Sequence, residues 1–206
     1  MRYLHAVEPN RSIAFFDEQF RRQTGAAALA LNPFEEMALP CLHGDVLDFG
    51  CGLGNLAFAA AKLGCTVTAL DASAAAVDHV RSRAAAEGVA VHGALADLRD
   101  YAIADDYDCI VSIGLLMFFD CPTALEVLAQ LQAHVRPGGV AIVNVLVEGT
   151  TYLDMFDPSA HCLFAESELQ SRFAGWHVER CEARDFAAPG DTIKRFSTVI
   201  ARKAAA

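Results

Sequence analysis

The stretch Asp-Val-Leu-Asp-Phe-Gly-Cys-Gly-Leu-Gly-Asn at residues 45–55 joins a short apolar strand to a glycine-rich turn. An alanine-rich segment over 55–63 follows, and Gly64 suits a helix end, so the pattern predicts a strand, a tight turn and a helix in succession. The three glycines of the turn let a ligand approach the backbone where a side chain would collide. The free N–H groups at the start of the helix can bind an anion, either a pyrophosphate or a carboxylate.

The same alternation of strand and helix continues along the chain. Apolar strands without polar alternation, separated by helices, predict an α/β fold with a parallel sheet covered on both faces. Two further strands follow one another with no helix between them, so they are expected to pair antiparallel. The expected strands are 45–49, 66–70, 89–91, 107–113, 140–147, 176–183 and 193–202, and the expected helices are 55–63, 122–135, 166–173 and one capped by Ser73 that runs to 87.

The N-terminal part differs from this pattern and predicts a helical cap over residues 10–41. Ile13, Phe16 and Phe20 lie at helical spacing, and Asn32-Pro33 restarts a second helix after a turn. We expect this cap to close over the site. The whole chain is expected to form a single domain, with 1–43 as the cap and 44–206 as the core, because 206 residues suit one buried core rather than two.

Composition narrows the class of partner. The net charge of −10 repels phosphate backbones and anionic membrane surfaces, which favours a small-molecule partner over nucleic acid or a membrane. The first eleven residues lack the apolar core of a signal peptide, and the seven cysteines form no C-x-x-C pair. We therefore expect a cytoplasmic protein, a monomer or homodimer, with reduced and mostly buried thiols rather than a disulfide.

The spacing of the turn separates two kinds of ligand. A dinucleotide fold requires G-x-G-x-x-G, and its third glycine would fall at position 55, where this chain has Asn55. The loop also carries Asp48 and no lysine or arginine that would neutralise a pyrophosphate. Asp71 follows about twenty residues on, where an acidic side chain can accept hydrogen bonds from both hydroxyls of a ribose.

Five successive motifs resemble those of class I S-adenosylmethionine-dependent methyltransferases: D-F-G-C-G-L-G at 48–54, L-D-A-S at 70–73, A-D-L at 96–98, the strand 108–113 and R-P-G-G-V at 136–140. The resemblance implies a Rossmann-like, doubly wound seven-stranded sheet of order 3-2-1-4-5-7-6 and S-adenosylmethionine as cofactor. Asp48 fits that cofactor because a sulfonium cation favours nearby carboxylates. The cofactor-binding residues it implies, with Asp48 added, are Gly50, Cys51, Gly52, Asp71, Ala72, Asp97, Leu98 and Ser112.

The second half is similar to the bacterial tellurite-resistance methyltransferases, small enzymes that methylate tellurite and related oxyanions. The similarity rests on residues 115–119, 162–169, 173–176 and 195–203. That family carries a His-Arg pair and a further Arg in the final hairpin. Here the pair is Ala183-Arg184 and the later position is Asp191, so an oxyanion would bind more weakly.

Methyl transfer itself needs an aligned nucleophile shielded from water, and a harder nucleophile also benefits from a base. His161 is the candidate base, and Arg184 and Arg195 are the candidate substrate-contacting cations. Met117, Phe118 and Phe16 are expected to line the substrate cleft, and no metal is expected. The alternatives are a non-catalytic S-adenosylmethionine-binding module, a methyltransferase acting on an unrelated small thiol or amine, and a nicotinamide-dependent oxidoreductase.

Overall fold

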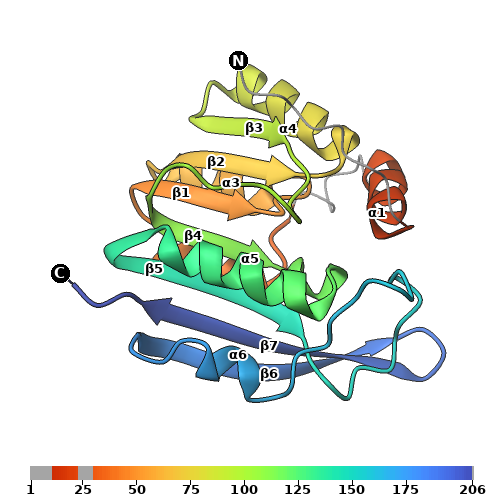
Figure 1. Cartoon of the computed structure of the whole chain (residues 1–206). Helices are drawn as coiled ribbons and strands as arrows, with labels where there is room; N and C mark the ends of the chain where they lie inside the picture. Colours follow the sequence, from red (N-terminus) through yellow and green to blue (C-terminus); the bar gives the residue numbers. More distant parts are fainter. Residues whose placement is uncertain (1–10, 23–29, 206) are drawn as a thin grey trace.

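The computed structural model describes residues 11–22 and 30–205 (Figure 1). The predictions for the N-terminal segment 1–10 and for the middle of the cap, residues 23–29, lie outside these residues. Within the described part, the cap contributes helix α1 (Arg11–Arg22) and the short helix α2 (Pro33–Ala38), as the helical spacing and Asn32-Pro33 predicted.

Seven strands form one sheet in the order β3-β2-β1-β4-β5-β7-β6, which confirms the predicted topology. The first five strands pair in parallel, and β7 pairs antiparallel with both β5 and β6. The strands are β1 (Asp45–Phe49), β2 (Thr66–Asp71), β3 (Val91–Leu95), β4 (Tyr107–Ile113), β5 (Val135–Leu146), β6 (His177–Ala188) and β7 (Thr192–Arg202).

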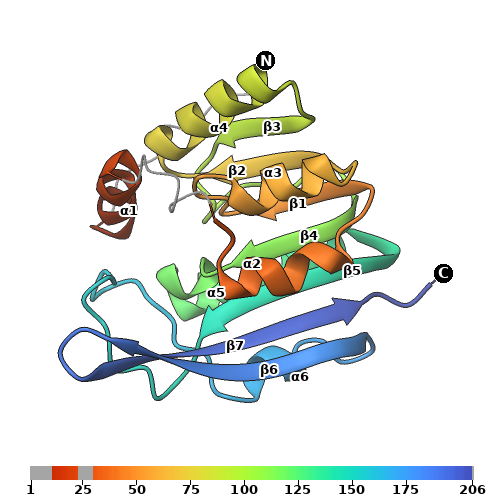
Figure 2. The same ribbon diagram turned by 180° about the vertical axis from the view of Figure 1, so that it is seen from behind.

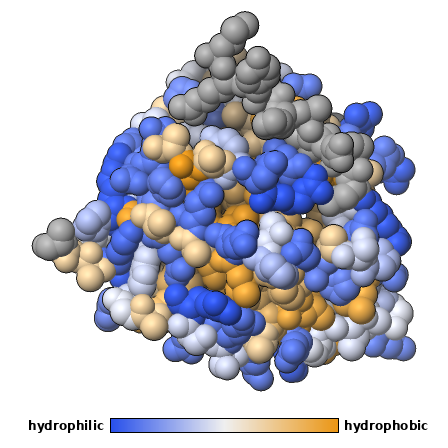
Figure 3. All heavy atoms as spheres, in the orientation of Figure 1, coloured by the Kyte–Doolittle hydropathy of each residue, from blue (hydrophilic) through white to orange (hydrophobic). Residues whose placement is uncertain are grey.

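Helices cover both faces of this sheet, as an apolar parallel sheet requires. On one face lie α5 (Cys121–Ala133) and α6 (Glu168–Ser171), and on the other lie α2, α3 (Asn55–Lys62) and α4 (Ala74–Glu87) (Figures 1 and 2). Each face has its own buried apolar cluster. The face that carries α5 exposes a band of apolar atoms among polar side chains (Figure 3).

Local signals in the sequence set most helix ends. The Ser73 hydroxyl accepts a hydrogen bond from the Ala76 N–H at the start of α4, and Gly88 adopts a left-handed conformation at its end, with φ of 63°. Asn32 and Glu35 form a reciprocal capping box at the start of α2. Among residues 11–22 and 30–205, no helix combines the length and apolar character needed to cross a membrane.

Several predicted element bounds differ from the structure, and strand pairing explains the difference for the third strand. It runs over Val91–Leu95 rather than 89–91, because it pairs residue by residue with Val67–Asp71 of β2. The hydrophobic stretch in the sequence overlaps this strand only at Val91. The predicted helix 166–173 is also shorter, since α6 covers only Glu168–Ser171.

The segment 136–139 belongs to the sheet, although the sequence predicted that it ends a helix. Helix α5 stops at Ala133, and β5 already begins at Val135 beside Tyr107. Gly139 makes this path possible, because a Cβ there would lie 2.5 Å from the carbonyl oxygen of Asp108. The backbone of Gly139 also accepts a hydrogen bond from the Lys203 N–H at 2.9 Å.

The prediction of reduced thiols was wrong for two of the seven cysteines. Cys121 and Cys162 form a disulfide across a sequence separation of 41 residues. It links the first residue of α5 to the loop before α6, where the Cys162 N–H also donates to the Met117 carbonyl. Spacing rules detect cysteine pairs that are close in sequence, so they do not predict a disulfide between two distant cysteines that the fold brings together.

Thiol titration tests this bond directly. The unfolded, unreduced protein should react with five equivalents of a thiol reagent and the reduced protein with seven, since five cysteines are free. Cys121→Ser should lower the free energy of unfolding by about 3–4 kcal/mol, the effect of opening a loop of this size. Cys181→Ser removes an exposed free thiol and is the control. Seven reactive thiols before reduction would contradict the disulfide.

Candidate functional site

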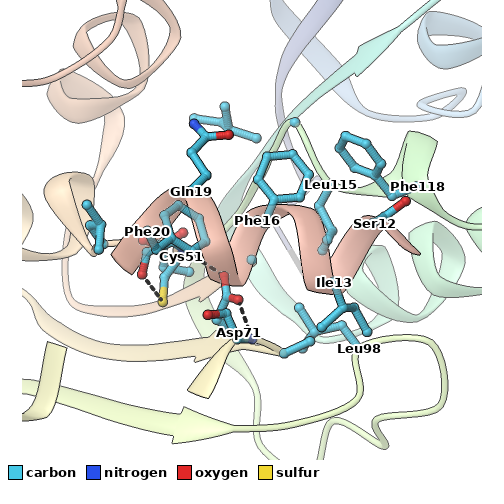
Figure 4. A pocket seen from close by; sticks show the side chains of 18 of the residues that line it. Ser12, Ile13, Phe16, Gln19, Phe20, Cys51, Asp71, Leu98, Leu115 and Phe118 are labelled. Atoms are coloured by element: carbon cyan, nitrogen blue, oxygen red, sulfur yellow. Dashed lines mark hydrogen bonds between the residues drawn. The ribbon is translucent and has the colours of Figure 1, made fainter. Parts of the chain in front are cut away.

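A cleft of about 550 Å³ lies at the carboxyl ends of β1, β2 and β4, and residues of helix α1 line it (Figure 4). Figure 1 shows α1 beside these strand ends. Open parallel sheets bind ligands at this edge, at the point where the strand order reverses. In this sheet β2 lies on one side of β1 and β4 lies on the other, so the strand order reverses between β1 and β4. The cleft lies at this point. Its size is that of an ordinary small-molecule site.

The glycine loop forms the floor of the cleft through its backbone. Gly50 and Gly52 have φ of 92° and 52°, a region that favours glycine. A Cβ at Gly50 would lie 2.9 Å from the Leu115 side chain, and one at Gly52 would lie 3.2 Å from the Phe20 ring. The backbone N–H groups of Gly50 and Cys51 both donate to the Leu70 carbonyl at 2.9 Å. Glycine is therefore required here for conformation and for space.

Asp71 links the ends of β1 and β2. Its Oδ2 accepts a hydrogen bond from the Gly52 N–H and its Oδ1 accepts one from the Ser73 N–H, both at 2.8 Å. Burial raises the pKa of Asp71, and these N–H donors act in the opposite direction. The predicted acid therefore lies directly against the predicted glycine loop.

Three carboxylates face one another at the β1 side of the cleft. Asp48 is buried, and its desolvation, followed by the charges of Glu35 and Asp71, raises its pKa to about 8. Burial also raises the pKa of Glu35, although the Asn32 N–H opposes the shift. In the free cleft Asp48 therefore carries a proton at neutral pH, and a bound cation favours its ionised form.

Asp97 lines the cleft at the end of β3, but it is not a free carboxylate. Its Oδ1 accepts from the Arg99 Nε at 2.8 Å, and its Oδ2 lies against the second guanidinium nitrogen. These hydrogen bonds lower the pKa of Asp97, so the group is ionised at neutral pH. Arg99 also lines the cleft.

Helix α1 covers the cleft and is held there by a residue that sequence reasoning missed. Asp17 accepts hydrogen bonds from the Ser73 hydroxyl at 2.6 Å and from the Ala75 N–H at 3.1 Å, at the start of α4. Phe20 of α1 lies beside Cys51, and Phe16 makes an edge contact with Phe118 at a centroid distance of 5.0 Å (Figure 4). The aromatic side chains of α1 therefore cover the cleft.

Comparisons with known proteins agree with this geometry. A family profile described as "Methyltransferase domain" matches residues 46–139. A curated protein named "Hemagglutinin 1", from Eikenella corrodens, is 32% identical in an alignment of length 186 that covers 84% of this chain and 58% of that protein. The "Probable S-adenosyl-L-methionine-dependent methyltransferase TehB" of Haemophilus influenzae (strain 10810) is 29% identical in an alignment of length 171 that covers 80% of this chain and 58% of that protein.

The chain is similar to S-adenosylmethionine-dependent methyltransferases, and residues 46–139 carry the match to the methyltransferase domain. The crystal structure of TehB from Haemophilus influenzae superposes with a TM-score of 0.74 at 22% identity, and it covers 91% of this chain and 67% of that one. At that identity the similarity establishes the shared fold. The chain spans just under three fifths of the length of the two curated relatives.

Most residues that the methyltransferase motifs pointed to meet at the cleft. The lining includes Asp48, Gly50, Cys51, Gly52, Asp71, Ala72, Asp97 and Leu98, together with Phe16 and Phe118. The donors and acceptors fit S-adenosylmethionine, because the glycine-loop backbone, the buried acid Asp71 and the acid Asp48 lie in one cleft. Among the described residues, no group of three or more His, Cys, Asp or Glu side chains could hold a metal ion.

Ser112 and Met117 do not reach the cleft. Consecutive side chains of a strand point to opposite faces, so Ile113 of β4 lines the cleft while Ser112 is completely buried. Met117 is buried in an apolar cluster with Phe156. The motif placed both residues correctly along the chain, but it carried no information on which way their side chains point.

The three predicted catalytic residues also lie away from the cleft lining. His161 stacks on Phe156 at 5.0 Å. Arg195 binds both carboxylate oxygens of Asp185 at 2.9 Å, and the Arg184 guanidinium lies 5.2 Å from the centre of the Phe186 ring. The structure therefore does not bring these three side chains to the cleft.

Asp17 offers a test of how this methyltransferase domain holds its cap. Asp17→Asn removes the charge from two hydrogen bonds to α4, so α1 should dock less tightly and S-adenosylhomocysteine should bind about tenfold more weakly, as expected for the loss of one charged hydrogen bond. Calorimetry measures the affinity, and trypsin should cleave faster after Arg21.

Glu18→Gln is the matched control for Asp17→Asn. Glu18 is the next residue of α1, and it pairs with Arg22 at the surface. Its replacement should leave both the affinity and the rate of cleavage unchanged. Equal rates in the two variants would show that Asp17 does not hold the helix.

Proposed function

We propose that this chain transfers the methyl group of S-adenosylmethionine to a small-molecule acceptor. The observation that carries the proposal is the meeting of the glycine loop and Asp71 in one cleft, with the Gly52 N–H bound to the Asp71 carboxylate. The match of residues 46–139 to the methyltransferase domain and the sheet order support the same activity. We also propose that residues 1–206 work as a single domain, because all described strands form one sheet.

The lining residues divide the cleft along its length. We propose that Asp97 and Leu98 hold the adenine, Asp71 and Ala72 hold the ribose, and Gly50, Cys51 and Gly52 hold the amino-acid part. Asp48 lies at the β1 side, where its carboxylate favours the positive charge of the bound cofactor. Leu115 and Phe118, which follow β4, then border the reacting methyl group.

The chain's own contribution to the reaction is alignment and exclusion of water. The cofactor supplies an activated methyl group, and the acceptor displaces its sulfur in one step. Aromatic rings shield the cleft from water, and they belong to Phe16, Phe20 and Phe118. Asp17 keeps α1 in place over the cleft. Holding two reactants in line and dry is the main requirement for such a transfer.

Asp71→Asn tests the proposed ribose contact. The amide keeps the size of the side chain but loses the charge and one acceptor, so the affinity for S-adenosylhomocysteine should fall at least tenfold by calorimetry. Asp78→Asn, an exposed change in α4, is the control and should bind normally. The proposed function fails if the unmodified protein binds no S-adenosylhomocysteine at high micromolar concentration.

The raised pKa of Asp48 predicts a pH-dependent affinity. In the free protein Asp48 is protonated below about pH 8, and a bound cation favours its ionised form. Binding therefore releases a proton, so the affinity for S-adenosylmethionine should rise by up to about tenfold per pH unit towards pH 8 and level off above it. Calorimetry across pH measures the slope.

Asp48→Asn is the reference for that titration. The amide cannot ionise, so it removes this part of the slope and leaves only the titration of the ligand itself. S-adenosylhomocysteine, which has no sulfonium charge, should show the smaller dependence on Asp48. Identical slopes for Asp48→Asn and the unmodified protein would contradict the assignment.

A further inference from the structure

More acidic than basic side chains line the cleft. Among the described residues these acids number four, and the proposed function assigns Asp71 to the ribose, Asp97 to the adenine and Asp48 to the positive charge of the cofactor. Glu35 is the acid that has no assigned contact with the cofactor. Among the described residues, Arg99 is the one basic side chain that lines the cleft, and it is bound to Asp97. An acceptor therefore enters a field set by carboxylates.

The cations of the final hairpin do not offset this field. Arg195 is held by both oxygens of Asp185, and Arg184 lies over the Phe186 ring. Neither lines the cleft. An oxyanion in the cleft would meet the Glu35 carboxylate, and the one cation of the described lining, Arg99, is already bound to Asp97. Burying an unpaired charge is strongly unfavourable. The geometry thus disfavours an anionic acceptor.

Aromatic rings form another part of the lining. The Phe16 and Phe118 rings meet edge to face at 5.0 Å, and the Phe20 ring lies 6.0 Å from Phe16 (Figure 4). Aromatic faces attract cations and also bury apolar groups. A lining that combines such rings with a carboxylate suits a molecule that joins a positive group to an apolar substituent.

Glu35 is placed to contact such a positive group. The capping box of α2 holds its Oε2 against the Asn32 N–H at 2.7 Å. Within residues 11–22 and 30–205, the Asn32 N–H is the only hydrogen-bond donor to the Glu35 carboxylate. The other carboxylate oxygen can therefore accept a hydrogen bond from a ligand. The side chain is half-buried and lines the cleft. The capping box thus orients the Glu35 carboxylate and leaves one of its oxygens available to a ligand.

Resting on the proposed function, we propose that the acceptor is a primary or secondary amine with an apolar substituent, and that Glu35 binds its ammonium group and accepts a proton from it. The freed nitrogen electron pair then forms a bond to the methyl carbon, and the carbon–sulfur bond breaks with its electron pair passing to sulfur. The products are the methylated ammonium, neutral S-adenosylhomocysteine and protonated Glu35, which returns its proton to water. The burial that raises the pKa of Glu35 makes it a better base than an exposed carboxylate.

The first test compares acceptors with labelled S-adenosylmethionine and the full chain. 2-Phenylethylamine and its N-methyl derivative should be methylated, while tellurite and selenite should give no product above background. Turnover of either oxyanion faster than the amines would overturn the inference. Binding of S-adenosylhomocysteine without turnover of any amine would also overturn it, and would leave cofactor binding intact. Absence of that binding would instead reject the proposed function.

The second test is the pair Glu35→Gln and Glu36→Gln. Both remove one carboxylate from α2, but Glu36 is exposed and does not line the cleft. Glu35→Gln should lower kcat/KM for the amine at least about 100-fold at pH 7, the contribution of a general base. Glu36→Gln should leave it unchanged.

A pH profile separates a proton-accepting role from a structural one. The defect of Glu35→Gln should shrink at least tenfold near pH 10, where the amine is already unprotonated, while the affinity for S-adenosylhomocysteine stays within threefold of normal. Because Glu35 also caps α2, thermal unfolding of both variants is measured alongside. A defect of equal size at pH 7 and pH 10 in a folded protein would overturn the role of Glu35.

Discussion

The hydrogen bond from the Gly52 N–H to the Asp71 carboxylate is the constraint on which the site depends. It joins the loop after β1 to the end of β2, and it requires glycine at a position where φ is 52° and where Phe20 leaves little room for a side chain. The same carboxylate accepts from the Ser73 N–H, and Ser73 both caps α4 and donates to Asp17 of α1. One acidic side chain thus connects the floor of the cleft with the helix that covers it.

Charge in the cleft follows from this arrangement. Burial of Asp48, reinforced by the charges of Glu35 and Asp71, raises the pKa of Asp48 to about 8, so a bound cation favours its ionised form. The proposed amine acceptor fits these charges better than the tellurite-type oxyanion that the family resemblance implies. The resemblance and the electrostatics therefore agree on the cofactor and differ on the acceptor.

Much of the fold was predictable because its signals are local. The strand 45–49, the turn glycines, the Ser73 cap and the Gly88 stop each lie within a few residues of the feature that they determine. The errors arose where distant segments decide the structure. The extent of β3 depends on β2, the path of 136–139 depends on β4 and Lys203, and the disulfide joins residues 41 positions apart.

The sequence by itself determined the alternation of strands and helices, the glycine loop and the acids at the strand ends, because these signals are local. The order of the sheet was implied by the resemblance to methyltransferases. Only the tertiary structure decided which side chains face the cleft. Ser112 and Met117 are buried in the core. Arg184 and Arg195 contact Phe186 and Asp185 instead of the cleft. The N-terminal helices contribute Asp17, which holds α1, and Glu35, which lines the cleft. The physical reason is that motif spacing records position along the chain, whereas orientation and charge balance come from the packing of segments that are far apart in it.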